Sequence, residues 1–136
     1  MTPEEKQLLI KDLCARLPYG VNIRATFLSF TEDKLETRDI ELTYYNAGYL
    51  DEHWIEAKPY LRPMSSMTEE ERKELSDKAI ELELDYLAQN DEPNSIKGMM
   101  SSTYQIDWLN AHHFDYRGLI EKGLAIAVTE ENNPYK

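Results

Sequence analysis

The sequence has little of what several classes of functional site require. Cys14 is the only cysteine among 136 residues, so no internal disulfide can form and a four-thiolate zinc site is excluded. The five glycines form no phosphate-binding loop, and the GxSxG motif of serine hydrolases does not occur. No apolar run approaches the ~20 residues that span a bilayer as a helix. These absences argue against a disulfide-stabilised domain, a P-loop enzyme, an α/β-hydrolase and a membrane-spanning helix.

Positive charge is also scarce. Lysine and arginine number 15 against 26 acidic residues, a net charge of −11. No basic cluster could neutralise phosphates, which disfavours direct nucleic-acid binding and attachment to an anionic membrane. The start "MTPEEKQLLIKDLC" lacks the basic flank and apolar core of a signal peptide. With an apolar fraction of 41%, the chain is expected to be a cytoplasmic protein forming a single domain over residues 1–136.

Two capping boxes mark the starts of helices. Thr2 and Glu5 flank the first, with Pro3 at the favoured first helical position, and Thr68 and Glu71 flank the second. The first box predicts a helix that ends at the "LPYG" stretch, with Leu9, Leu13 and Leu17 on its apolar stripe and Cys14 buried on or beside it. The second predicts a long helix over residues 69–89.

Between these helices the apolar pattern changes to a period of two. "VNIRATF", "DIELTYY" and "HWIEAKPYL" alternate apolar and polar residues, which predicts a short antiparallel sheet over residues 20–62, either a meander or an SH3-like curl. A further helix should run from about Ser102 to His113. A short helix, "YRGLIEK", should then be capped by Asp115 and ended by Gly123, before the strand "LAIAV". The fold class is therefore α+β: an N-terminal helix, the sheet, a long helix and a C-terminal helix–turn–helix–strand unit.

The stretch "HHFDYRGLI" contains the residues that most resemble a chemical site. His112, His113 and Asp115 could bind a metal ion, but adjacent helical side chains point ~100° apart and would not grip one ion together. Histidines near the end of a helix also interact favourably with its last carbonyls. We therefore predict no catalytic residue, metal or cofactor, and expect Phe114, Leu119 and Ile120 in the core, with Arg117 held by an acid or by helix-end carbonyls. A metal-assisted hydrolase using His112, His113 and Asp115 is the alternative.

Aromatic residues of the expected sheet are the main candidates for a binding surface. Tyrosine and tryptophan bury a large area at low entropic cost, which favours them as interface anchors. We predict that the sheet presents such an interface, and the acidic helix 69–89, which could mimic the charge of DNA, is the competing surface. The predicted interface residues are Tyr44, Tyr49, Trp54 and Tyr60.

Three blocks carry a resemblance to a protein group. "LCARLPYGV", "KPYLRPMSSMTEEE" and "FDYRGLIEKGLA" resemble, in order and spacing, uncharacterised small proteins of phages, prophages and mobile elements of Bacteroides-type bacteria. The resemblance covers well under half of the chain and supplies no functional residue. It implies an interaction or accessory protein without catalysis, which acts on a host or phage protein. Self-association is the other partner that we expect.

Overall fold

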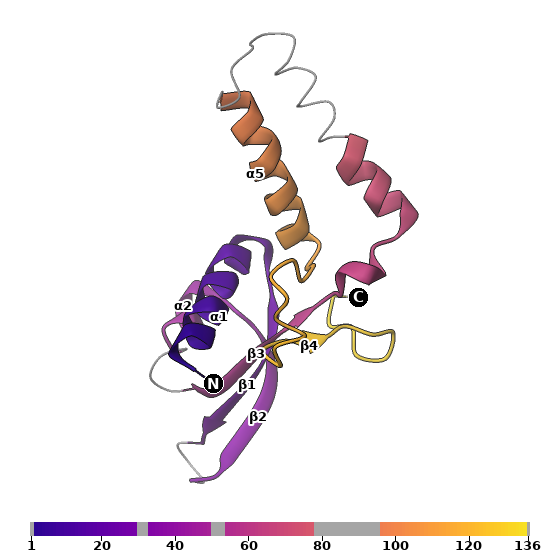
Figure 1. Cartoon of the computed structure of the whole chain (residues 1–136). Helices are drawn as coiled ribbons and strands as arrows, with labels where there is room; N and C mark the ends of the chain where they lie inside the picture. Colours follow the sequence, from indigo (N-terminus) through magenta and orange to yellow (C-terminus); the bar gives the residue numbers. More distant parts are fainter. Residues whose placement is uncertain (1, 30–32, 50–53, 78–95, 136) are drawn as a thin grey trace.

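The computed structural model describes residues 2–29, 33–49, 54–77 and 96–135, and it has the predicted α+β character (Figure 1). The chain begins with α1 (Pro3–Arg16). The Thr2 hydroxyl accepts a hydrogen bond from the Glu5 N–H at 3.1 Å, and the Glu5 carboxylate accepts one from the Thr2 N–H at 3.0 Å. The predicted capping box is confirmed. A single 3₁₀ turn, η1 (Leu17–Tyr19), leads into the sheet.

The sheet has four strands: β1 (Asn22–Leu28), β2 (Leu35–Glu41), β3 (Trp54–Leu61) and β4 (Ile126–Ala127). Their order is β2-β1-β3-β4. β1 is antiparallel to both neighbours, and its Ile23 pairs with Ile40 on one side and Pro59 on the other. β3 and β4 run parallel. The predicted antiparallel pairing of the strands within residues 20–62 is therefore confirmed, but a meander order is wrong. The apolar β1 takes the central place, so β3 pairs with β1 instead of β2, and β4 makes the sheet mixed.

The second strand ends earlier than predicted, and a short helix follows it. α2 (Tyr44–Ala47) is capped by Thr43, whose hydroxyl accepts a hydrogen bond from the Asn46 N–H at 3.3 Å. Asn46 accepts one in return from the Thr43 N–H at 2.8 Å. This second reciprocal cap ends the extended segment. Tyr44 therefore lies on a helix and not on a strand.

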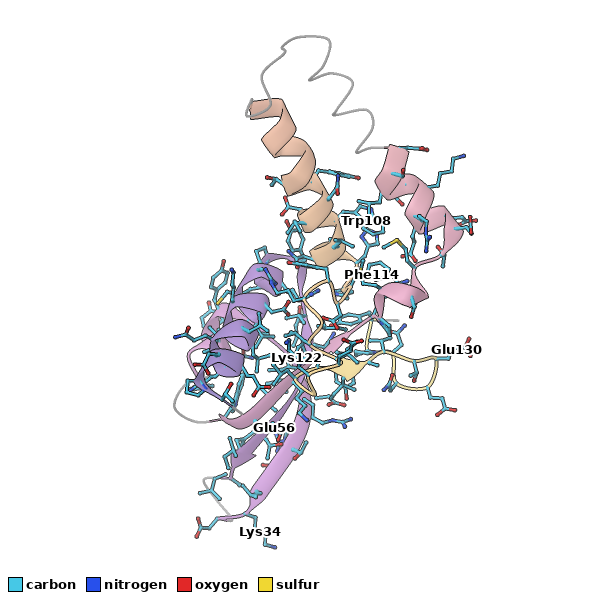
Figure 2. The ribbon with its side chains drawn as sticks, viewed as in Figure 1. Lys34, Glu56, Trp108, Phe114, Lys122 and Glu130 are labelled. Atoms are coloured by element: carbon cyan, nitrogen blue, oxygen red, sulfur yellow. The ribbon has the colours of Figure 1, made fainter. Side chains whose placement is uncertain are left out.

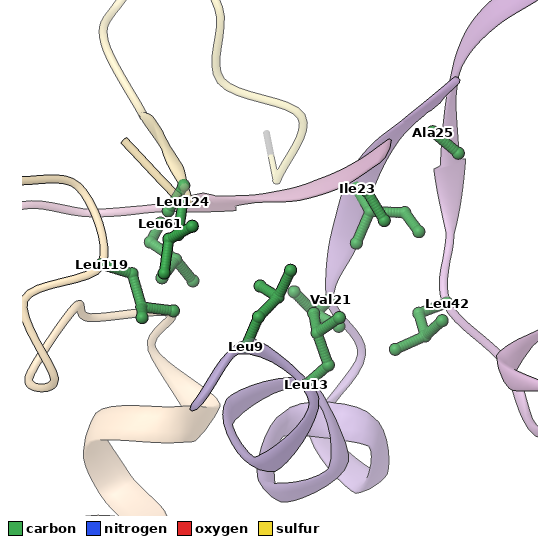
Figure 3. Close-up of a cluster of buried hydrophobic side chains, with 11 residues drawn as sticks. Leu9, Leu13, Val21, Ile23, Ala25, Leu42, Leu61, Leu119 and Leu124 are labelled. Atoms are coloured by element: carbon green, nitrogen blue, oxygen red, sulfur yellow. The ribbon is translucent and has the colours of Figure 1, made fainter. Parts of the chain in front are cut away.

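The main core lies between α1 and one face of the sheet, and the C-terminal segment closes it (Figure 3). Its buried side chains include Leu9, Leu13, Val21, Ile23, Leu42, Leu61, Leu119 and Leu124. The predicted burial of Leu9 and Leu13 is confirmed. Cys14 is exposed, which contradicts its predicted burial. The reason is that α1 turns Asp12 and Arg16 inward beside Leu13, so Cys14 faces solvent.

The remaining helices carry a second, smaller cluster. Residues 69–77 are helical, and the predicted Thr68–Glu71 capping box is confirmed by reciprocal hydrogen bonds of 3.0 and 3.1 Å. The rest of the predicted helix, residues 78–89, lies outside the described residues. α5 (Ile96–Ala111) begins before the predicted Ser102. Trp108 and Phe114 pack together where α5 meets the sheet domain (Figure 2). In the described part of the chain, no helix is long and apolar enough to cross a membrane.

The predicted short helix "YRGLIEK" is wrong, because residues 116–125 form bends and turns. Gly118, at a φ of 74°, interrupts any helix there. The Leu124 N–H donates to the Leu119 carbonyl at 2.9 Å and the Gly123 N–H to the Ile120 carbonyl at 3.1 Å, which is the Schellman pattern. Gly123 has a φ of 74°, so its predicted left-handed conformation is confirmed.

Candidate functional site

The two candidate histidines lie at the end of α5, where their rings contact different partners. The His113 N–H donates to the Asn110 carbonyl at 3.1 Å and the Phe114 N–H to the Leu109 carbonyl at 2.9 Å, a second Schellman pattern. His113 occupies its left-handed position, with a φ of 65°. The His112 ring stacks on Trp108 at a centroid distance of 3.9 Å, whereas the His113 ring stacks on Tyr135 at 3.5 Å. The helix end therefore separates the two imidazoles.

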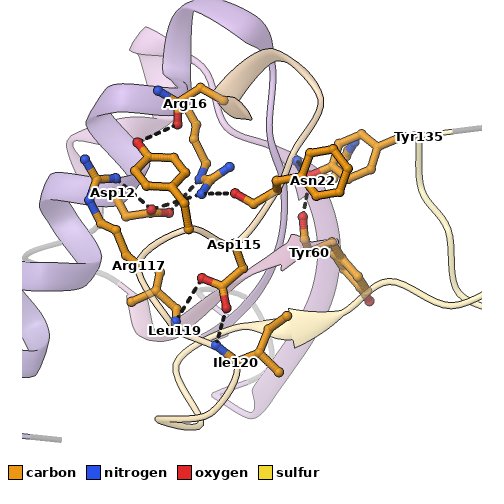
Figure 4. A network of polar contacts seen from close by, with 12 residues as sticks. Asp12, Arg16, Asn22, Tyr60, Asp115, Arg117, Leu119, Ile120 and Tyr135 are labelled. Atoms are coloured by element: carbon orange, nitrogen blue, oxygen red, sulfur yellow. Dashed lines mark hydrogen bonds and ion pairs between the residues drawn. The ribbon is translucent and has the colours of Figure 1, made fainter. Parts of the chain in front are cut away.

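Asp115, the third candidate ligand, is committed to the backbone. One carboxylate oxygen accepts a hydrogen bond from the Leu119 N–H at 2.9 Å, and the other accepts one from the Ile120 N–H at 3.0 Å (Figure 4). Asp115 thus caps the following turn, although that turn is not the predicted helix. Among the residues that the structure describes, no group of three or more His, Cys, Asp or Glu side chains could hold a metal ion.

His113 is also chemically unusual. Burial, together with the nearby charge of Arg16, lowers its pKa to about 4, so the imidazole is neutral at pH 7. Its Nδ1 is buried without a hydrogen-bond partner among the described residues. A neutral, stacked ring in a left-handed position serves the packing of the C-terminal segment, where the Tyr135 hydroxyl donates to the Tyr60 carbonyl at 2.7 Å.

A buried ionic network lies beside the histidines. Arg16 and Asp12 are both fully buried on α1, and the Arg16 Nε donates to Asp12 at 2.8 Å. Arg16 also donates to the Phe114 carbonyl at 2.6 Å (Figure 4). Arg117 donates to the other Asp12 oxygen at 2.8 Å, which confirms the prediction that an acid holds it. The network ties α1 to the C-terminal segment. The i, i+4 spacing of Asp12 and Arg16 was the available sequence signal.

Arg62 links the Thr68–Glu71 capping box to the smaller cluster around Trp108 and Phe114. Its guanidinium forms two hydrogen bonds of 2.7 Å to the Glu71 carboxylate and lies 4.1 Å from the centroid of the Phe114 ring. The hydrogen bonds from Arg62 lower the pKa of Glu71 to about 2. Phe114 in turn stacks on Trp108, with centroids 5.8 Å apart. These stacked groups stabilise the fold. Because Glu71 is paired with Arg62, it is not available as a free charge on the predicted acidic helix.

The four predicted interface residues fall into two groups. Tyr44 and Tyr49 are 80% and 47% exposed, and Trp54 is half-buried. Tyr60 is only 2% exposed, so it is not available as a surface anchor and this part of the prediction is wrong. Its hydroxyl donates to Asp39 at 2.9 Å and accepts from Arg24 at 2.6 Å, which fixes the side chain within the sheet.

A groove of about 830 Å³ lies at the end of the sheet remote from α5. Tyr49 and Trp54 pack edge to face in it, with ring centroids 6.1 Å apart. The volume lies in the range of natural ligand pockets. The residues that line it, from all three long strands and the segment around α2, are Phe27, Leu28, Ser29, Asp33, Arg38, Ile40, Asn46, Tyr49, Trp54 and Ile55.

A β-bulge in β3 builds one wall of this groove. Thr26 pairs with Glu56, but its neighbour Phe27 pairs with Trp54, so Ile55 is the extra residue. Strict alternation would place Trp54 on the face of Glu56. The bulge moves it to the face of Phe27 and leaves Ile55 63% exposed. This shift could not be read from the alternation of the sequence.

Two charged residues, Arg38 and Asp33, are among those that line the groove. Arg38 is paired with Glu36 at 2.6 Å and lies over the Phe27 ring at 6.0 Å. Asp33 is exposed and has a φ of 53° in the turn between β1 and β2.

Comparison of the chain with protein-family models, curated proteins and solved structures gave no match. The groove therefore has to be interpreted from its own geometry.

Proposed function

We propose that this chain is a protein-interaction or accessory protein without catalysis, and that the groove is its binding site. The observation that carries the proposal is the partly exposed Tyr49–Trp54 pair beside Ile55 and Phe27 in a groove of about 830 Å³. Aromatic side chains in a partly desolvated recess are typical anchors of protein interfaces. Two of the predicted interface residues contribute to this groove directly.

The proposed occupant is a segment of a partner protein with an aromatic or aliphatic side chain next to a basic one. The apolar walls favour the first side chain. The exposed Asp33 of the groove and the net charge of −11 favour the second, and Arg38 competes less because Glu36 is already paired with it. The same net charge disfavours nucleic acid as the occupant. A partner from a host or a phage fits the sequence resemblance, and this origin stays a prediction.

The alternative, a metal-assisted hydrolase, has less support. His112, His113 and Asp115 each have a structural partner, namely Trp108, Tyr135 and the backbone of the following turn. The acidic helix is also a weaker candidate, since Glu71 is paired with Arg62.

Two finer features of the predicted fold stay predictions as well. They are an SH3-like curl of the sheet and a C-terminal helix–turn–helix–strand unit, in which turns replace the short helix.

Selection from a random peptide display library tests the proposed function. The wild-type chain should enrich peptides in which an aromatic or aliphatic residue adjoins lysine or arginine. Tyr49→Ala should weaken binding of the selected peptides by roughly five- to thirtyfold, since truncating an aromatic anchor costs about 1–2 kcal/mol. Tyr45→Ala is the matched control: Tyr45 is a tyrosine of the neighbouring α2, is 95% exposed and does not line the groove.

Two results would overturn the proposal. One is the absence of any enriched motif. The other is a set of peptides that bind Tyr49→Ala and wild type equally well, which would place their site elsewhere. Because Tyr49 is 47% exposed, its truncation should leave the fold intact, and an unchanged circular dichroism spectrum and melting temperature would verify this.

A further inference from the structure

β2 forms one edge of the sheet, and no other described strand pairs with its outer side. The direction of its backbone groups follows from two hydrogen bonds that flank the strand: Leu42 N–H to the Val21 carbonyl at 2.9 Å, and Ser29 N–H to the Lys34 carbonyl at 2.7 Å. In an antiparallel ladder, hydrogen-bonded pairs alternate with pairs that point away. The even-numbered residues of β2 therefore face β1 with their backbone groups, and Leu35, Thr37 and Asp39 direct theirs outward.

The next outward-facing residue, Glu41, ends the open edge. Its carbonyl accepts a hydrogen bond from the Asn46 side chain at 3.0 Å. This bond supports the assignment, because it shows the Glu41 carbonyl pointing away from β1. The open edge thus consists of three residues with Thr37 at its centre.

The side chains of β2 carry opposite charges at equal distances from this centre. Glu36 precedes Thr37 and Arg38 follows it. Both side chains lie on the sheet face shared with Phe27, and they form an ion pair of 2.6 Å within one chain. Charges on an edge strand usually prevent association of sheets. Here their order is self-complementary under a two-fold rotation.

We propose that β2 pairs with β2 of a second copy of this chain, antiparallel, with Thr37 on the two-fold axis. Leu35 then pairs with Asp39 of the second copy, Thr37 with its counterpart, and Asp39 with Leu35. Each pair can exchange two backbone hydrogen bonds. Glu36 of each copy lies opposite Arg38 of the other, so four side chains of alternating charge meet around the axis. The two sheets become one continuous sheet.

Neighbouring registers are electrostatically inferior. A two-fold axis through Glu36 would oppose two carboxylates, and one through Arg38 would oppose two guanidinium groups; like charges directly opposite each other destabilise a strand pair. An axis through Leu35 would match Glu36 with Lys34, but it would extend the pairing to Asp33, whose φ of 53° does not fit a strand. Only the register centred on Thr37 uses the whole open edge and places both Glu36 and Arg38 opposite a residue of the other charge.

Two features limit the strength of the contact. Each copy carries a net charge of −11, so the copies repel at long range until salt screens them. The open edge is also short. We therefore expect a reversible dimer that forms at high protein concentration and physiological ionic strength. The Asp39 side chain does not oppose pairing with Leu35, because Arg24 and the Tyr60 hydroxyl already donate hydrogen bonds to it.

Substitution of Thr37 isolates the backbone edge. Thr37→Pro removes an outward N–H and none of the backbone hydrogen bonds to β1, so it should abolish the dimer in sedimentation velocity over a micromolar to millimolar series. Thr37→Val is the matched control: it also loses the 3.0 Å hydrogen bond between Thr37 and Thr26, but keeps the backbone N–H. Wild type and Thr37→Val should dimerise alike. A wild type that stays monomeric throughout the series would overturn the proposal, as would a Thr37→Pro chain that still dimerises.

Charge reversal tests the register without relying on proline. Glu36→Arg alone places two guanidinium groups opposite each other, and Arg38→Glu alone places two carboxylates opposite each other, so each variant should dimerise at least tenfold more weakly than wild type. An equimolar mixture of the two should recover a heterodimer, because every facing pair is then of opposite charge. Weak singles that do not recover on mixing would refute the Thr37-centred register.

This contact uses the edge of β2 and goes beyond the proposed function of the groove. Thr37 does not line the groove, so Thr37→Pro should leave the selected peptides bound. Tyr49→Ala should conversely leave the dimer intact. The failure of either proposal is therefore visible without the failure of the other.

Discussion

Removing the Asp12 carboxylate should destabilise the protein severely, although the residue does not line the groove. Asp12 is fully buried and accepts hydrogen bonds from two guanidinium groups, those of Arg16 and Arg117. Arg16 is itself fully buried, and its Nη1 has no partner among the described residues. In Asp12→Asn the buried charge of Arg16 would keep only neutral oxygens as acceptors, among them the Phe114 carbonyl at 2.6 Å.

The magnitude follows from the burial of both partners. Removal of one member of a buried ion pair costs about 3–5 kcal/mol, because the other charge stays uncompensated. For a chain of 136 residues, each kcal/mol corresponds to a loss of ~3–4 °C in melting temperature. Asp12→Asn should therefore melt roughly 10–20 °C below wild type. Arg117 contributes less to this loss, because its side chain is 18% exposed and can turn to solvent.

Urea unfolding followed by tryptophan fluorescence measures the effect, and a double variant tests its cause. Asp12→Leu combined with Arg16→Met removes both buried charges and fills similar volumes, so the pair should be less destabilised than either single variant. Two results would refute the reasoning. They are a cost for Asp12→Asn below about 1 kcal/mol, the size of an ordinary hydrogen bond, and a double variant whose cost equals the sum of the singles.

Two further predictions concern His113 and Cys14. The pKa of His113 is about 4 in the folded chain and about 6.5 when unfolded, so between these values the unfolded chain binds more protons and stability falls as the pH is lowered. Allowing for partial exposure, the loss in unfolding free energy should reach no more than about 2 kcal/mol. It should vanish in His113→Asn, because asparagine tolerates the left-handed conformation. Urea unfolding between pH 7 and 5 would contradict this if the unfolding free energies of both chains changed equally with pH. Cys14 is exposed, so a thiol reagent should modify it in the native chain at a rate within about tenfold of that in the urea-unfolded chain. Much slower modification of the native chain would mean that Cys14 is buried, as the sequence had suggested.

The helix starts at Thr2 and Thr68 could be predicted from the sequence because their signals are local. A threonine cap with a glutamate three residues later fixes both partners of the reciprocal hydrogen bonds, and the boxes at Thr2 and Thr68 formed as expected. Gly123 was predictable for the same reason, since a left-handed residue that ends a turn favours glycine. In each case the deciding atoms lie within a few residues of one another.

The strand order and the bulge could not be predicted in this way. Alternation shows which residues of a strand share a face, but not which neighbour the strand pairs with, so it did not distinguish β2-β1-β3 from a meander. The inward turn of Asp12 and Arg16 was also hidden. Their partners, Phe114 and Arg117, lie about a hundred residues away in the sequence. Without that contact, the same positions look like the exposed side of α1.

The histidine stretch and the groove show why the most polar local motif did not mark the candidate site. "HHFDYRG" concentrates groups with several possible chemical roles, but each has a structural partner. His113 stacks on Tyr135, Asp115 caps the following turn and Arg117 binds Asp12 of α1. The groove, in contrast, forms where the regular pattern fails: at the bulge beside Ile55 and at the helix that replaces the end of a strand. Such departures disrupt the regular hydrogen bonding of a sheet, and they are common where they re-aim a side chain for another role. In this protein they place Trp54 and Tyr49 against each other at one end of an otherwise regular sheet, which is the physical reason for proposing a binding site at that end of the molecule.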